Sequence, residues 1–448
     1  MRRVLVLGLA TATALLWSVG LAERPYEGVE LNIVLIEEPE SRAAASQALA
    51  QRFFEETGIR VNFDLLTSRA MTEKIQIESV ARTGAIDVIR TGPGIRANHV
   101  EAGWIRPLDP YIEMFGFESE LADWTALNTH ARFGDDPTVW AIPVNANIQL
   151  LVYRTDLFGD PEEQAAFKAR YGYELRPPET TVEMLDAAEF FTRDTTGDGR
   201  TDLYGYFERL VMTFPLAKIA YKLMYSTGHT ILDADGNVAF DTPAMAEGLE
   251  WYRELKQYMP DTVAPGDYSE LERAWGAGEL AMTTTWIGTV RNFMDPERNP
   301  NTHDVTAVTL VPRFPDSGLD HGKAIVGGGG YAVHTDSPNP EAAAKWIFWL
   351  LSEENLEPYV EAGGNPPRGA FFEHPMVTED EIWGRIMPYW FAALELTGEN
   401  RLEIPEVVGA FNENLAVMVS DILFEDADPT VTLRETATEN QRLLDRRR

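Results

Sequence analysis

The sequence predicts an α/β fold, because apolar runs typical of strands alternate with segments whose apolar residues have helical spacing. Residues 30–36 form a short apolar run that indicates a buried strand, and residues 41–56 carry apolar side chains on one helical face. Residues 59–66 predict a second strand, residues 69–83 a second helix, and residues 85–89 a third strand. This succession is the pattern of a parallel sheet whose strands are joined by crossover helices.

Polar residues follow these predicted strands directly. Glu37 and Glu38 come after the first strand, and Arg90 and Thr91 come after the third. Ligands of open α/β sheets bind outside the carboxyl ends of the strands, so these four residues are candidates for a binding site. The alternative is that they are ordinary solvated loop residues.

Further elements are predicted along the rest of the chain. Residues 140–153 alternate and then become apolar, which suits a strand running between two lobes. Four consecutive glycines, Gly327–Gly330, interrupt an apolar strand over 325–333, and they indicate either a hinge or a close approach of the backbone to another group. Helices or strands are also expected from Thr180 (a capping box with Glu183), over 241–259, 304–312 and 338–352, and over much of 377–445.

Composition excludes several classes of protein. The chain has 448 residues, with 71 acidic and 38 basic side chains and a formal net charge of −33, so binding of nucleic acid is disfavoured. It has no cysteine, which excludes disulfides, thiolate zinc sites and iron–sulfur clusters. Its seven histidines are scattered, and no nucleophile elbow, Walker loop or dinucleotide fingerprint occurs. We therefore expect no cofactor and no enzyme of these classes, while a hydrolase that works through paired carboxylates stays open at this point.

The N-terminus predicts a secretory signal peptide over residues 1–22. Two arginines are followed by an apolar run over 4–16 and then by Gly20-Leu21-Ala22, which supplies small residues at the cleavage positions. A membrane anchor is the alternative, but the apolar run is shorter than the ~20 residues of a comfortable span. We expect cleavage after Ala22 and export to the periplasm.

One glycine-rich segment contains oxygen side chains at a spacing that resembles part of a calcium loop. These are led by Asp194, Asp198 and Asp202, which surround Gly199. The position that a calcium loop fills with a bidentate glutamate is Gly205 here. A turn in which the aspartates accept hydrogen bonds from backbone amides is therefore favoured over a structural calcium site.

Aromatic residues are the remaining chemical signal. The chain has 11 Trp, 15 Tyr and 21 Phe, and aromatic faces stack on the apolar faces of sugar rings. Trp286 stands in a turn-like segment, 283–288, where no helical or strand stripe explains it. A role in ligand binding is therefore favoured for Trp286 over simple packing.

Taken together, six stretches resemble the extracellular solute-binding proteins of ABC importers, in the carbohydrate-binding family that includes maltose-binding protein. The similarity of each single stretch to the family is weak, but their order along nearly the whole chain is fairly specific to the family. The stretches are residues 49–59, 87–109, 142–158, 274–286, 331–347 and 361–368.

The resemblance implies a two-lobe periplasmic-binding-protein fold, with discontinuous α/β lobes, a central cleft and crossing hinge strands. The hinges would be Asn145–Gln149 and Gly327–Gly330, and closure around a ligand would be a hinge motion. The implied N-lobe comprises residues 23–146 and 331–375, and the implied C-lobe comprises residues 147–330 and 376–448.

The same resemblance implies a set of ligand-binding residues. Trp286 looks like the stacking tryptophan of the family, while Thr91 stands where the most similar sugar binder has an aromatic residue. That departure favours a monosaccharide, disaccharide or polyol over a long maltodextrin. The implied ligand-binding residues are Glu38, Thr91, Asn147, Arg209, Trp286, Tyr331, Arg368 and Phe411. By the same resemblance, Tyr331 and Arg368 would face the cleft.

These observations predict a monomeric periplasmic binding protein that delivers a small sugar or polyol to the membrane permease of an ABC importer. One alternative is a binding protein for a cationic solute such as a polyamine, since Glu37, Glu38 and the net charge could serve an ammonium group. A second alternative is a secreted glycosidase, which would need two carboxylates facing each other across a sugar bond.

Overall fold

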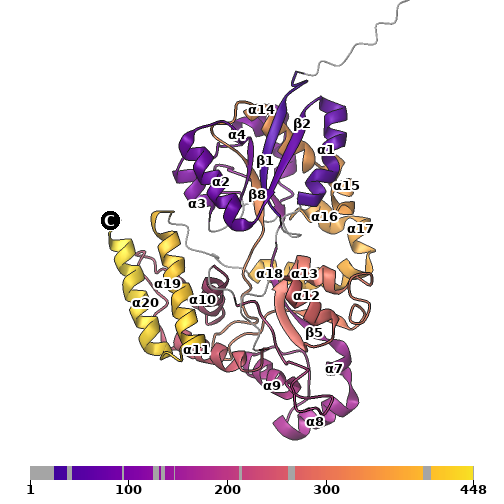
Figure 1. The fold of residues 1–448 in the computed structure, drawn as a ribbon, viewed down its shortest axis with the longest axis vertical. Coiled ribbons are helices and arrows are strands. Elements are labelled where there is room, and N and C mark those ends of the chain that lie inside the picture. Colours follow the sequence, from indigo (N-terminus) through magenta and orange to yellow (C-terminus); the bar gives the residue numbers. More distant parts are fainter. Residues whose placement is uncertain are drawn as a thin grey trace, which may run out of the picture.

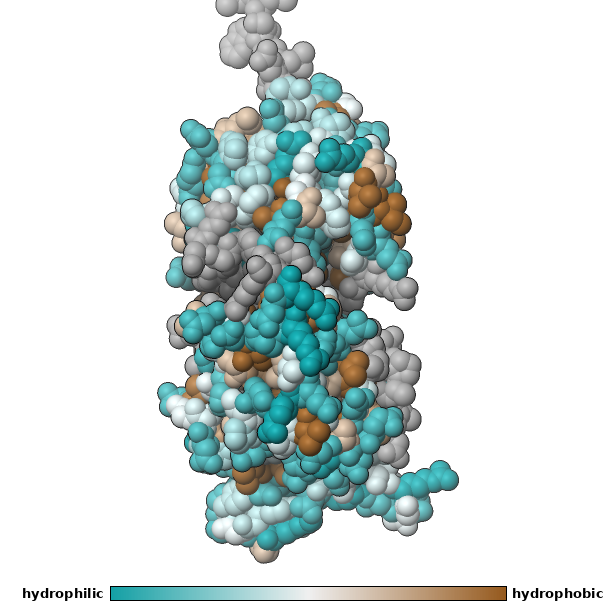
Figure 2. All heavy atoms as spheres, turned by 90° about the vertical axis from the view of Figure 1, so that its left-hand side faces the viewer, coloured by the Kyte–Doolittle hydropathy of each residue, from teal (hydrophilic) through white to brown (hydrophobic). Residues whose placement is uncertain are grey.

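The computed structural model describes residues 25–37, 43–92, 95–124, 131–132, 137–145, 147–210, 214–260, 268–396 and 405–446. The described chain forms two α/β lobes, each built around its own sheet (Figure 1). The predicted signal peptide and Glu38 lie outside the described residues. Seen from the side, the outline of the molecule narrows between the lobes (Figure 2).

The sheet of the first lobe has five strands in the order β2-β1-β3-β8-β4. The strand β1 pairs in parallel with β2 and β3, whereas β8 is antiparallel to both β3 and β4. The late strand β8 thus returns from the second lobe and inserts between two early strands. The strands are β1 (Glu30–Ile36), β2 (Arg60–Leu66), β3 (Val88–Thr91), β4 (Ile142–Asn145) and β8 (Gly329–Val333).

Helices cover the faces of this sheet (Figure 1). The buried ring of Trp346 in α14 meets Phe53 of α1 edge to face, with ring centroids 4.9 Å apart. The helices are α1 (Ala43–Thr57), α2 (Ser68–Ala81), α3 (Arg96–Glu101), α4 (Asp109–Phe115), α5 (Glu118–Leu121), α14 (Pro340–Leu350), the 3₁₀ helix η2 (Glu353–Asn355) and α15 (Leu356–Glu361). The short helices α16 (Gly369–Glu373) and α17 (Pro375–Thr378) follow, and their buried side chains Phe371, Phe372 and Val377 belong to the core of the second lobe, where they pack with α18 (Glu381–Leu396).

The second lobe is mostly helical around a three-stranded antiparallel sheet of order β6-β5-β7. Its strands are β5 (Gln149–Arg154), β6 (Met282–Trp286) and β7 (Thr306–Thr309). Its helices are α7 (Thr155–Gly159), α8 (Pro161–Tyr171), α9 (Thr181–Phe191), α10 (Phe214–Ser226), α11 (Pro243–Lys256), α12 (Tyr268–Gly276), α13 (Ile287–Phe293), α18 (Glu381–Leu396), α19 (Pro405–Phe424) and α20 (Pro429–Asp445).

The C-terminal helices α19 and α20 pack side by side and extend the second lobe (Figure 1). Of the described helices, α19 alone is long and apolar enough over Val407–Phe424 to cross a membrane by length and composition. Half of that stretch is buried, and α19 contacts α10, α11 and α20, which is the packing of a core helix.

Most of the elements predicted between residues 30 and 91 are confirmed, with ends shifted by a few residues. The helix predicted from the capping box is confirmed as α9, in which Thr180 accepts from the Glu183 amide while the Glu183 carboxylate accepts from the Thr180 amide. Two expectations differ from the structure. Residues 140–153 form two strands in two different sheets, β4 and β5.

The second difference concerns the segment that contains Trp286. The turn-like interpretation of residues 283–288 is wrong, because β6 extends through Trp286 and α13 begins directly after it. Three consecutive β-branched threonines favour extended backbone, and Thr285 pairs with Leu150 in the middle of the sheet. Trp286 is therefore the last residue of β6, and it is held there by the pairing of β6 with the central strand β5.

Candidate ligand-binding site where the chain crosses between the lobes

Two segments that link the sheets run side by side, and we call them together the crossing region (residues 145, 147–149 and 326–329). The amide of Gly327 donates to the Asn147 carbonyl at 2.6 Å, and the amide of Gly329 donates to Asn145 Oδ1 at 3.1 Å. The crossing region is thus held by hydrogen bonds between its own two segments. Asn147, one of the sequence-predicted site residues, is buried within it.

The glycines of the crossing region allow very close backbone contacts. Gly328 has φ +85°, and a Cβ at that residue would lie 2.3 Å from the Asn145 carbonyl oxygen. A Cβ at Gly329 would lie 2.6 Å from the Thr91 carbonyl oxygen. The glycine run is therefore needed for close approach and, at Gly328, for the left-handed backbone conformation. Its use as a hinge stays a prediction.

The first lobe contributes the end of β3 to the crossing region. Thr91 pairs with Gly330 and is fully buried, and its hydroxyl lies 3.0 Å from Nδ1 of His99. The neighbouring Arg90 donates from Nη2 to the Gly328 carbonyl at 2.9 Å. Burial lowers the pKa of His99 to about 4, so this ring is neutral at pH 7.

The second lobe contributes Trp286 at the end of β6. The indole is 5% exposed, and the ammonium of Lys218 from α10 lies 4.8 Å from the centroid of its ring. Gly327 of the crossing region lies so close to the indole that a Cβ on residue 327 would be 2.6 Å from the ring carbon Cζ3 of Trp286. Trp286 therefore stands between a cation of its own lobe and the backbone that links the lobes.

Arg209 follows a segment that runs beside β6. Phe207 forms a parallel bridge with Thr283, and the Phe207 amide donates to the Met282 carbonyl. Since both chains run the same way, Arg209 lies near the Trp286 end of β6 rather than at its start. Its side chain is half-buried.

Three of the sequence-predicted site residues are placed differently from the expectation. Tyr331 is fully buried in the first lobe, where its hydroxyl lies 2.8 Å from Ser46 Oγ and burial raises its pKa to about 12. Phe411 is fully buried in the second lobe and meets Phe240 edge to face. The expectation that Tyr331 faces the cleft is therefore corrected, and both residues belong to the cores.

Arg368 is also a structural residue in this fold. Its guanidinium is buried and donates from Nε to Asp123 at 2.8 Å, and from Nη1 to Glu120 at 3.1 Å and to the Leu351 carbonyl at 2.9 Å. Those contacts direct the guanidinium at the first lobe's own groups, which corrects the expectation that it faces the cleft. They tie α16 to α5 and the end of α14.

The aspartate-rich loop forms the turn that was favoured from the sequence. Asp194 accepts hydrogen bonds from the amides of Thr196, Gly197 and Gly199, and Asp202 accepts from the amide and hydroxyl of Thr195. These bonds lower the pKa of both carboxylates. No group of three His, Cys, Asp or Glu side chains in the described part of the chain is arranged to hold a metal ion.

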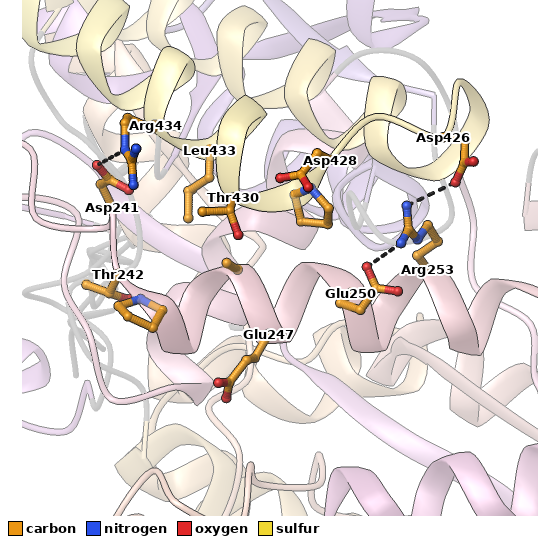
Figure 3. Close-up of a pocket in the computed structure, with 13 residues that line it drawn as sticks. Asp241, Thr242, Glu247, Glu250, Arg253, Asp426, Asp428, Thr430, Leu433 and Arg434 are labelled. Carbon is orange, nitrogen blue, oxygen red and sulfur yellow. Dashed lines mark hydrogen bonds and ion pairs between the residues drawn. The ribbon is translucent and has the colours of Figure 1, made fainter.

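A surface groove of about 720 Å³ lies away from the crossing region, between α11 and the start of α20 (Figure 3). Ion pairs span the groove, since Arg434 pairs with Asp241 and Arg253 pairs with Asp426, while Glu250 pairs with Arg253 within α11. Asp428 caps α20 by accepting from the Val431 amide. The groove is therefore the seam between two packed helices, and most of its charged groups take part in ion pairs or in a helix cap.

Two features at or beside the crossing region were missed in the sequence. One is Lys218, whose position over Trp286 depends on how α10 packs. The available signal was the pair Lys218 and Lys222, which stand four residues apart in an otherwise apolar helix. The other is the role of the Asn145 side chain, since the resemblance implied a hinge at Asn145–Gln149 but did not indicate that Asn145 Oδ1 accepts a hydrogen bond from the Gly329 amide.

The two sheets, the crossing region and its position between the lobes define the two-lobe periplasmic-binding-protein fold. Residues 48–382 match the family described as bacterial extracellular solute-binding protein, and the chain belongs to this family. No curated protein sequence matches the chain at a significant level.

Solved structures agree with this assignment of the fold. A solute-binding protein from Agrobacterium radiobacter K84 in complex with ribitol is 24% identical, with a TM-score of 0.78 over 93% of this chain and 99% of that one. The maltose-bound MalE3 of T. maritima is 18% identical, with a TM-score of 0.75 over 93% and 100%. A protein from Agrobacterium vitis S4 with bound D-mannitol is 18% identical, with a TM-score of 0.71 over 93% and 98%.

Proposed function

We propose that this chain is the substrate-binding component of an ABC importer, which captures a small sugar or polyol between its lobes and delivers it to the membrane permease. Family membership supports the general role. The observation that carries the proposal is the meeting of Trp286 from one lobe and Arg90 and Thr91 from the other at the glycines of the crossing region. A ligand at this place would touch both lobes and favour the closed arrangement.

The chemistry of these groups suits a hydroxyl-rich guest. An indole offers an apolar face for the C–H side of a sugar or polyol, and Arg209 and Asn147 offer hydrogen-bond donors and acceptors. Arg90 and Lys218 place two positive charges beside the crossing glycines, which favours a neutral ligand over an ammonium. That charge distribution argues against the polyamine alternative.

The size of the guest is part of the proposal. Thr91 is a small residue whose hydroxyl is already engaged by His99, so it offers no stacking surface for a second sugar ring. Two of the similar structures hold ribitol and D-mannitol, which are short polyols. We therefore propose a monosaccharide-sized ligand or a disaccharide at most, bound without chemical turnover.

The remaining parts of the proposal concern the place of the protein in the cell. The family is extracellular, and we propose that residues 1–22 direct the chain to the periplasm and are removed after Ala22. We further propose that the mature protein is a monomer without a cofactor. Mass spectrometry of periplasmic protein tests the cleavage site, and light scattering tests the monomer.

A thermal-shift screen tests the ligand class. The mature protein is heated with ribitol, D-mannitol, D-tagatose, maltose, maltotriose or spermidine, and hits are confirmed by titration calorimetry. A ligand at 100 times its Kd should stabilise the native state by about 2.7 kcal/mol. Stabilisation by a sugar or polyol and recovery of that compound unchanged would support the proposal. Stabilisation by spermidine alone, or consumption of the sugar, would overturn it.

A further inference from the structure

One carboxylate oxygen behind the crossing region receives three donors. Glu208 Oε2 accepts from Lys222 Nζ at 2.5 Å, from the Tyr252 hydroxyl at 2.7 Å and from the Tyr206 hydroxyl at 2.8 Å. The donors come from α10, α11 and the segment beside β6. Glu208 and Lys222 are only 6% and 5% exposed, so they form a buried ion pair. The carboxylate of this pair accepts two further hydrogen bonds, from the two tyrosines.

The two tyrosines remain donors at neutral pH. Burial, reinforced by the Glu208 charge, raises the pKa of Tyr206 and of Tyr252 well above the usual value. A buried ion pair of this kind contributes little net stability compared with well-packed apolar residues, because both charges lose their hydration. Its main effect is to fix geometry, since the charges are satisfied in a single arrangement of the surrounding elements.

That geometry extends to the ligand-binding residues. Lys222 and Lys218 are four residues apart on α10 and so lie on the same helical face. Lys222 is held by Glu208, and Lys218, one turn earlier, lies over the ring of Trp286. The rotation of α10 that satisfies Glu208 is therefore the rotation that places Lys218 over the indole.

The chain around Glu208 makes a second connection. Phe207, which precedes it, forms a bridge with Thr283 of β6, and Arg209, which follows it, is the candidate ligand contact. Glu208 is buried whereas the adjacent Arg209 is half-buried, so the two neighbouring side chains lie in different surroundings.

We propose that Glu208 is a positioning residue for the ligand site, which acts through Lys222 to set Lys218 over Trp286 and to orient Arg209. The inference rests on the proposed function for its effect on ligand affinity. The effect of Glu208 on Trp286 can be measured without a ligand, so the inference about Glu208 and the proposed function can fail separately.

The first experiment measures the Lys218–Trp286 contact in the ligand-free mature protein. Tryptophan emission is compared between the wild type and Lys218→Met, and the comparison is repeated in a Trp286→Phe background, where the difference should vanish. It is then repeated in the double variant Glu208→Gln/Lys222→Met, which removes both charges and so leaves no buried ion without a partner. We expect the Lys218→Met difference to fall by at least half in that double variant.

Two results of this first experiment would overturn the inference. One is the absence of any Lys218→Met effect in the wild type, which would mean that the lysine does not lie over the indole in solution. The other is an effect of full size in the double variant, which would mean that the ion pair does not position α10.

The second experiment measures affinity for ribitol and D-mannitol by calorimetry. We expect at least tenfold weaker binding in the double variant, although its melting temperature stays close to that of the wild type. Glu163→Gln is the matched control, because it breaks the ion pair of Glu163 with Arg193 in the same lobe but away from Trp286. It should lower the melting temperature without changing the Kd.

Wild-type affinity in the double variant would overturn the positioning role, and so would a Kd that follows the melting temperature across all variants. If neither polyol binds the wild type, the proposed function fails for these ligands, and the emission experiment still decides the role of Glu208.

Discussion

Gly327 lies directly against the six-membered ring of Trp286. A Cβ on residue 327 would come within 2.6 Å of Cζ3 and 2.8 Å of Cη2, distances that real side chains do not reach. The backbone that joins the lobes is thus in contact with the aromatic residue proposed to hold the ligand. A change in the angle between the lobes at this strand would be felt by the indole.

Replacing Gly327 by alanine should move the indole. The added methyl group overfills a packed contact, so we expect a loss of about 1–3 kcal/mol in the free energy of unfolding. We also expect weaker binding of any sugar or polyol found in the screen. Urea unfolding and calorimetry measure the two effects. Gly384→Ala in α18 is the control, because nothing lies within 4 Å of its added Cβ. That change should stabilise the helix by up to about 1 kcal/mol.

The emission of Trp286 should change on ligand binding. Because the ring is buried, the substitution that tests this must keep most of its volume. Trp286→Ala would empty a packed site and should cost about 3–5 kcal/mol. Trp286→Phe keeps an aromatic ring and is the better variant. We expect it to remain folded by circular dichroism and to lose the ligand-dependent change in tryptophan emission. An unaltered fluorescence titration in Trp286→Phe would contradict the assignment of this residue.

Arg368 should affect stability rather than ligand binding. Arg368→Met removes the partner of Asp123 and Glu120, and we expect a loss of about 2 kcal/mol, below the usual range for fully buried pairs because both carboxylates keep access to water. Arg298→Met is the control, since its exposed pair with Asp295 should contribute less than about 0.5 kcal/mol. If Arg368→Met protein is stable but binds the ligand with a changed Kd, then Arg368 contributes to ligand binding.

His99 should make the first lobe sensitive to acid. Its pKa is lowered to about 4 in the folded state from 6.5, so the unfolded chain binds its proton more tightly. The free energy of unfolding therefore keeps its full value with respect to His99 above pH 6.5. It falls as the pH is lowered towards 4, with a maximum loss of about 3 kcal/mol. His99→Gln should flatten the stability profile in this window. The nearby His334 also has a lowered pKa and titrates in the same direction, so both variants should be measured.

Asp194 should stabilise its loop through backbone amides. Asp194→Ala removes the acceptor for three amides and should lower the melting temperature more than Asp198→Ala, which removes the acceptor for the Arg200 amide. We expect the same melting temperatures with millimolar calcium chloride and with EDTA. A calcium-dependent increase that disappears in Asp194→Ala would instead support the calcium loop.

Local patterns were sufficient to predict much of the first lobe. The apolar runs and helical spacing between residues 30 and 91 predicted three strands and two helices, and β1, α1, β2, α2 and β3 occur in that order. These signals are local because each depends on which faces of a short segment are buried. The capping box at Thr180 is local in the same sense, and α9 begins there. The order of the six stretches then identified the family.

Side-chain directions at the site depended on contacts between distant segments. Tyr331 lies beside the crossing glycines in sequence, yet it points at Ser46, because a shift of one residue in a strand reverses the face that a side chain occupies. Lys218 lies over Trp286 only because the fold brings α10 to the end of β6, a strand that comes much later in the sequence. The residues that carry binding chemistry could therefore be named from the chain, but which of them meet depends on the register and packing of separate elements, which no local pattern encodes.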